Sequence, residues 1–87
     1  MTSSQITLSP SRRAAARFVV GVRRAIQKAL VEEHIRNGLT QSEIARTLNV
    51  HRSVINRQSS GFEDITVSRI AELAYAMGRK PVLELVG

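Results

Sequence analysis

The sequence predicts one small, mainly helical domain with a long N-terminal helix and a short C-terminal β-strand. Three observations predict this fold class: apolar residues recur every three or four positions through 18–29, two short helical segments flank a tight turn within 40–61, and a strand-like apolar run occupies 81–86. The chain has 87 residues, which is enough for one domain but not for two. We divide it into an N-terminal tail at 1–9, a helical domain at 10–80 and a C-terminal strand at 81–87.

The composition excludes several classes of protein. Apolar residues make up 43% of the chain, which is typical of a folded domain rather than a disordered one. The chain has no cysteine, which excludes disulfide scaffolds, cysteine-based zinc sites and thiol catalysis, and fits a reducing, cytoplasmic setting. No apolar run is long enough to cross a membrane, and the polar stretch 1–10 is not expected to be a secretory signal.

The first long segment, over residues 10–37, is predicted to be a helix. Ser9 and Pro10 form a typical start, with serine as the N-cap and proline at the first helical position, and Gly38 is placed to end it. Gly21 either kinks this helix or splits it in two. A continuous helix would be about 40 Å long, so we expect part of it to pack outside the chain's own core. Its predicted inward stripe consists of Phe18, Val19, Val22, Ile26 and Ala29.

Positive charge is concentrated at the start of the chain. Residues 1–31 hold six basic residues and no acidic one, whereas residues 32–87 hold seven of each, and the net charge is +6. A one-sided cationic segment favours a polyanionic partner, with nucleic acid first and an anionic membrane surface second. The alternative is a basic helix face that is only solvated.

Residues 40–61 are predicted to form two short helices joined by a tight turn. Thr40 and Glu43 match a capping box at the start of the first helix, which runs to about residue 48. Asn49 is expected to adopt the left-handed conformation of the turn, because asparagine tolerates that conformation better than most residues with a side chain. A second helix follows over 52–59, and such a pair of helices is a helix-turn-helix motif.

The second helix of the motif is predicted to begin after His51, which caps it, and to end at Gly61. A further helix is expected over 67–77, capped by Thr66 and stopped by Gly78. Apolar side chains at helical spacing predict the inward faces. These inward residues are Ile44, Leu48, Val54, Ile55, Val67, Ile70, Leu73, Ala74 and Met77, and the aromatic residues Phe62 and Tyr75 are also assigned to the core.

The strand at 81–87 is predicted to place Leu83 and Leu85 on one face, against the core. A single strand is not stable in water, so it needs a partner. The candidates are the short alternating patch at residues 5–8, the same strand of a second chain, or both.

The stretch 39–61 resembles the DNA-binding domain of the phage-repressor and Cro class, also called the xenobiotic-response-element (XRE) class, which folds as a lambda-repressor-like bundle. The matching positions in the motif are Leu39, Thr40, Gln41, Glu43, Ile44, Ala45, Leu48, Val50, Ile55 and Gly61. The resemblance continues through Ile65–Val67, Ile70, Ala71, Leu73, Ala74, Ala76–Gly78 and Val82–Val86, so it covers residues 30–87. The sequence departs from the class at Asn49, where glycine is usual, and at Glu33, where an apolar residue is expected.

The resemblance implies which residues meet DNA. In this class the second helix of the motif enters the major groove, while the first lies across the backbone. The base-reading positions correspond to Arg52, Ser53, Asn56 and Arg57, on the outward side of the second helix. Backbone contacts are predicted for Gln41, Arg46 and His51, with simple exposure as the equal alternative for Arg46. For each base-reading arginine the alternative is a phosphate contact or a solvated surface.

We therefore predict a sequence-specific regulator of transcription that binds double-stranded DNA and acts as a homodimeric repressor of its own or a neighbouring promoter. The chain is also similar to antitoxin-type repressors, which form dimers through an intermolecular sheet. That similarity leaves open an antitoxin or mobile-element role, and a cognate toxin or another protein partner. An enzyme, a cofactor and a metal site are not expected, because the sequence has no nucleophile–base cluster, no paired carboxylates and no Gly-rich phosphate loop. The alternative function is a protein-interaction adaptor whose basic N-terminal helix binds an acidic partner.

Overall fold

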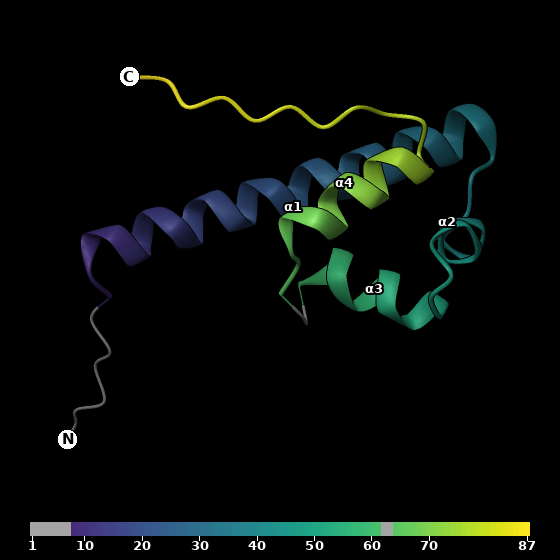
Figure 1. Ribbon diagram of the computed structural model, residues 1–87, viewed down its shortest axis with the longest axis horizontal. Coiled ribbons are helices and arrows are strands. Elements are labelled where there is room, and N and C mark those ends of the chain that lie inside the picture. Colours follow the sequence, from purple (N-terminus) through teal and green to yellow (C-terminus); the bar gives the residue numbers. More distant parts are fainter. Residues whose placement is uncertain (1–7, 62–63) are drawn as a thin grey trace.

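The computed structural model describes residues 8–61 and 64–87, and this part of the chain is mainly helical, as the sequence predicts (Figure 1). Its elements in chain order are α1 (Pro10–Asn37), α2 (Gln41–Leu48), α3 (Arg52–Ser60) and α4 (Val67–Ala76). The described residues contain no strand. Most of the predicted tail at 1–9 and the predicted core residue Phe62 lie outside the described residues.

The first helix, α1, is continuous through Gly21, so the expectation of a split helix is not met. Its start is the predicted one, because the Ser9 hydroxyl accepts a hydrogen bond from the backbone N–H of Arg12 and Pro10 occupies the first turn. Its end is also the predicted one. Gly38 has a φ of 71°, a left-handed conformation that favours glycine, and its N–H donates to the carbonyl of His34 at 2.9 Å.

The hydrophobic core lies where the four helices meet. Ile44 from α2, Ile55 from α3 and Leu73 from α4 are its most deeply buried side chains, each at most 1% exposed. α2 packs against α3 and α4, and α1 packs against α3. Ile26, Ala29, Ala45 and Met77 complete the buried cluster. Burial of these apolar side chains is the main favourable term that holds such short helices together.

The predicted inward stripe of α1 is only half buried. Ile26 and Ala29 are in the core, whereas Phe18 is 57% exposed and Val19 is also exposed. Every residue from Leu8 to Gly21 is exposed, whereas the buried residues of this long helix, Ile26, Ala29 and Glu33, all lie in its later part. In Figure 1 the N-terminal half of α1, drawn in purple and blue, therefore extends beyond the other helices.

Two predicted core residues of the last helix face solvent instead. Tyr75 is 76% exposed, because it lies on the side of α4 away from Leu73 and Met77, which fill the core. Val67 in the first turn is 83% exposed. The helix itself begins at the predicted cap, where the Thr66 hydroxyl accepts from the N–H of Arg69 at 3.0 Å.

The short strand predicted at 81–87 is not formed in the described structure, where this segment is irregular (Figure 1). Leu83 and Leu85 are 70% and 91% exposed, so their predicted contact with the core is absent. The physical reason is the lack of a sheet edge among the described helices, since a strand needs a hydrogen-bonded neighbour.

Candidate nucleic-acid interface

The connection between α2 and α3 is a tight turn built on Asn49. Its φ of 57° and ψ of 47° place it in the left-handed region, and it is the only residue other than glycine with a positive φ among those described. The N–H of Asn49 donates to the Arg46 carbonyl at 3.2 Å, and the N–H of Val50 donates to the Ala45 carbonyl at 2.9 Å. These bonds satisfy the last carbonyls of α2 and fix the direction in which α3 begins. The left-handed conformation predicted for Asn49 is confirmed.

The two helices of this pair also begin at their predicted caps. Thr40 and Glu43 form the full capping box: the Glu43 N–H donates to the Thr40 hydroxyl at 3.2 Å, and the Thr40 N–H donates to the Glu43 carboxylate at 3.0 Å. At the start of α3 the His51 Nδ1 accepts from the N–H of Ser53 at 3.1 Å. The Ser53 hydroxyl lies 2.8 Å from the same nitrogen. His51 and Ser53 therefore hold each other in place at the first turn of α3.

The outward face of α3 carries most of the predicted base-reading groups. Arg52, Asn56 and Arg57 are exposed, and Ser53 is half-buried beside His51. The same helix buries Ile55 fully and Ser59 almost fully, and Ile55 lies on nearly the opposite side of the helix from Arg57. Burial of Ile55 fixes the rotation of α3 about its axis and directs Arg57 away from the core, while Arg52 and Asn56 are exposed along the edge of the buried face.

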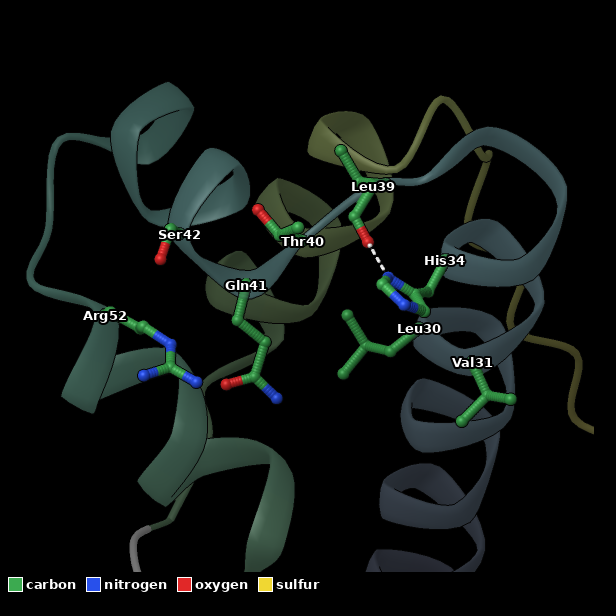
Figure 2. Close-up of a pocket in the computed structure, with 8 residues that line it drawn as sticks. All are labelled: Leu30, Val31, His34, Leu39, Thr40, Gln41, Ser42 and Arg52. Atoms are coloured by element: carbon green, nitrogen blue, oxygen red, sulfur yellow. Dashed lines mark hydrogen bonds between the residues drawn. The ribbon is translucent and has the colours of Figure 1, made fainter.

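Gln41 and Arg52 lie at the edge of one open hollow of about 520 Å³. Figure 2 shows the Gln41 side chain extending from the start of α2 toward Arg52, with Leu30 on the far side. The Oε1 atom of Gln41 is buried and has no hydrogen-bond partner in the described part of the chain. The other residues that line the hollow are Val31, His34, Leu39, Thr40 and Ser42. The structure thus brings together Gln41, predicted to contact the backbone, and Arg52, predicted to read bases.

The other two predicted backbone contacts do not line this hollow. Arg46 is exposed in the last turn of α2, where a cation is favourable beside the negative end of the helix dipole. His51 is exposed at the cap of α3. Both residues flank the turn at Asn49 rather than the hollow.

A partly buried ion pair between α1 and the segment after α4 is a feature that sequence reasoning missed. Glu33 is 7% exposed, and its carboxylate accepts from the Nε of Arg79 at 2.9 Å and from the Asn37 amide at 2.7 Å. Arg79 also donates to Glu32 at 3.0 Å. The hydrogen bond from Arg79, followed by that from Asn37, lowers the pKa of Glu33. The hydrogen bond to Glu33, followed by that to Glu32, raises the pKa of Arg79. The apolar pattern around Glu33 was the available signal for an inward position, but nothing local points to Arg79 as its partner.

Two further long-range contacts hold α1, one to α3 and one to the segment before α4. The Gln27 amide donates to the Ser59 carbonyl at 2.7 Å, and the Arg23 guanidinium lies 3.8 Å from the Asp64 carboxylate. Together with the ion pair of Glu33 and Arg79, these contacts attach the C-terminal half of α1 to the rest of the domain. The helices that carry the candidate interface are therefore held against the C-terminal half of α1.

Comparisons with family models, curated proteins and solved structures found no match for this chain. None of the described helices combines the length and the apolar character that a membrane crossing requires. Within residues 8–61 and 64–87, no three His, Asp or Glu side chains gather in a way that would hold a metal ion.

Proposed function

We propose that the chain is a sequence-specific double-stranded DNA-binding regulator whose α2 and α3 act as a helix-turn-helix motif. One observation carries the proposal: α3 buries Ile55 and Ser59 and turns Arg52, Asn56 and Arg57 outward. A short helix that is anchored by buried residues and exposes polar side chains is the element that fits the major groove of B-DNA. Arginine pairs there with guanine O6 and N7, and asparagine pairs with adenine.

The arrangement of α2 supports the same reading. Gln41 opens α2, and the backbone N–H groups of Gln41 and Ser42, which the capping box does not use, suit a phosphate oxygen. Arg52 lines the same hollow, and the Gln41 side chain extends toward it (Figure 2). A DNA backbone that passes over this hollow would meet Gln41 while α3 lies in the adjacent groove. The net charge of +6 adds non-specific attraction to the duplex.

The proposal includes a homodimer that represses its own or a neighbouring promoter, formed by pairing the C-terminal segments of two chains. The supporting observation is the exposure of Val82, Leu83, Leu85 and Val86 in a segment with no strand partner among the described residues. Pairing across a two-fold axis would satisfy the backbone and cover these side chains. Truncation after Lys80 tests it. Sedimentation of the truncated chain is expected to show monomers, and a stable dimer would contradict the pairing.

A titration on duplex DNA tests the function itself. The full chain is expected to select a preferred sequence from a randomised duplex pool and to lose affinity steeply as salt rises. Both behaviours are needed, because steep salt dependence alone describes any basic protein. An absence of base preference would contradict the proposal.

An adaptor that binds an acidic protein is the second candidate. It is favoured by one observation: the exposed half of α1, from Leu8 to Gly21, carries basic residues and no acidic residue. Its expected signature in the same titration is weak, sequence-independent DNA binding that disappears at moderate salt.

A further inference from the structure

Four cations lie on a single face of α1. With 3.6 residues per turn, Arg13, Arg17, Arg24 and Lys28 fall within an arc of about 60° and span about 22 Å along the axis. We call these four residues the cationic stripe. Ile26, which faces the core, lies on nearly the opposite side of the helix. The stripe therefore faces away from the domain's own core.

The charge of the stripe is not neutralised within the described chain. Ion pairs in residues 8–61 and 64–87 include those of Arg23, Arg69 and Arg79, and none in that part of the chain involves a member of the stripe. Arg13 donates to the Leu8 carbonyl at 2.6 Å, which leaves its charge unpaired. No acidic residue occurs before residue 32, so none is adjacent in sequence either.

The helix surface in the middle of the stripe is open, so an anionic group can approach it closely. Arg17 and Arg24 flank a surface hollow whose other lining residues are Ala16, Val20 and Gly21. Gly21 has no heavy atom within 4 Å of the position of a Cβ, so the space above the helix backbone is open. Residues 17 and 24 are about 10 Å apart along the helix axis, so their flexible guanidinium side chains can reach neighbouring phosphates over this gap.

The stripe also leads directly to the candidate interface. Val31 continues the same helix face one turn beyond Lys28, and it lines the hollow that Gln41 and Arg52 share (Figure 2). A DNA backbone that passes this hollow therefore has an unneutralised cationic path beside it along α1. The length of the path, about 22 Å, matches about six phosphates of one strand at 3.4 Å each.

We propose that the cationic stripe binds the phosphates of duplex DNA that flanks the sequence read by α3. The inference rests on the proposed function and extends it, because it makes the bound duplex longer than the read sequence on the side of α1. The stripe would add affinity without base preference, since phosphate contacts carry no sequence information.

The test compares two double variants of the full chain on the duplex selected from the randomised pool. The first, Arg17→Gln with Arg24→Gln, removes two charges from the stripe. The matched control, Arg12→Gln with Arg36→Gln, removes two exposed charges from other faces of the same helix. Thermal melts of both variants check that α1 still folds. Affinity is measured over a salt series, once with flanking base pairs and once with the duplex trimmed to the preferred sequence.

We expect the stripe variant to lower the log–log salt slope by about 1.8, which is 0.9 for each lost phosphate contact, with unchanged base preference. The control should keep a slope close to that of the parent, and the trimmed duplex should remove the difference between the variants. Equal slopes for the two variants on the long duplex would overturn the proposal. So would a stripe variant that binds DNA like the parent but loses binding to vesicles containing phosphatidylserine, which would assign the stripe to a membrane surface.

The proposed function is judged separately, from the unmodified chain. If the parent protein shows no base preference and only the stripe variant has a lower salt slope, sequence-specific regulation is contradicted and the stripe is retained as a phosphate site. If the parent protein shows base preference and the two variants have equal salt slopes, the stripe proposal is contradicted and the proposed function is retained.

Discussion

The two halves of α1 differ in what covers them. From Val22 onward the helix contributes Ile26, Ala29 and Glu33 to the buried part of the domain, whereas residues 8–21 are all exposed. Both halves carry apolar residues at helical spacing, so their own sequences do not account for the difference. The difference lies in the partners: α2, α3 and α4 are short, and the residues of α1 that join their buried cluster, Ile26 and Ala29, lie in the second half. Amphipathic periodicity predicts that a helix forms, but not which part of it finds a neighbour.

The largest expected effect contrasts one side chain from each half. Ile26→Ala should lower the free energy of unfolding by about 2–4 kcal/mol, because it leaves a cavity in the core. Phe18→Ala should change it by less than about 0.5 kcal/mol, because Phe18 is already 57% exposed. Urea unfolding of dilute protein measures both. Similar losses would mean that the N-terminal half of α1 is covered in solution.

The turn at Asn49 extends the comparison to the packed part of the chain. Asn49→Val should cost about 1–2 kcal/mol, because a β-branched residue resists the left-handed conformation. Asn49→Gly should leave stability unchanged or slightly higher, because glycine adopts that conformation without strain. Thermal melts of the two variants decide the matter, and a valine variant as stable as the parent would contradict this account of the turn.

The ion pair of Glu33, in the second half of α1, and Arg79 predicts that the free energy of unfolding depends on pH. Because the pKa of Glu33 is lowered on folding, the stability it contributes is fully present above its ordinary value of 4.5 and is lost as the pH falls through the lower folded value. Unfolding measured from about pH 6 to about pH 3 should show a smaller decline for Glu33→Gln than for the parent. The control is Glu84→Gln, which changes an exposed carboxylate in the C-terminal segment. Parallel declines in the parent and Glu33→Gln would contradict the prediction.

The smallest expected effect concerns Gly21, which stands at the boundary between the halves. Gly21→Ala should raise the free energy of unfolding by about 0.5–1 kcal/mol, because alanine loses less conformational entropy in a helix interior. No atom lies within 4 Å of the added Cβ, so no steric penalty offsets the gain. A loss of stability in urea unfolding would indicate that the backbone at Gly21 is not a regular helix in solution.

Features set by near neighbours in the chain were predictable from the sequence. The caps at Ser9, Thr40 and His51 and the left-handed Asn49 depend on residues at most three positions away, so their residue types carry the information. The outward direction of α3 was predictable because the positions of Ile55 and Arg57 follow from helical spacing.

Features set by distant partners were not predictable. Glu33 and Arg79 are 46 residues apart, and the sequence near either residue does not indicate that the other is its partner. The exposure of Tyr75 and of Phe18 depends on which faces the short helices leave uncovered, which is a property of tertiary packing. The absence of the predicted strand at 81–87 has the same origin, because a strand forms only where a neighbour is available. The roles of Arg52, Ser53, Asn56 and Arg57 toward DNA stay predictions.

A base-preference measurement on Arg57→Ala tests the central claim, that α3 reads DNA sequence, most directly. The variant should bind the preferred duplex more weakly by about 1–3 kcal/mol and lose its preference at one base position. Arg46→Ala is the matched control, since a backbone contact at Arg46 would weaken all sequences alike. An Arg57→Ala protein that weakens equally on every sequence in the pool, with its preference map intact, would contradict base reading by α3.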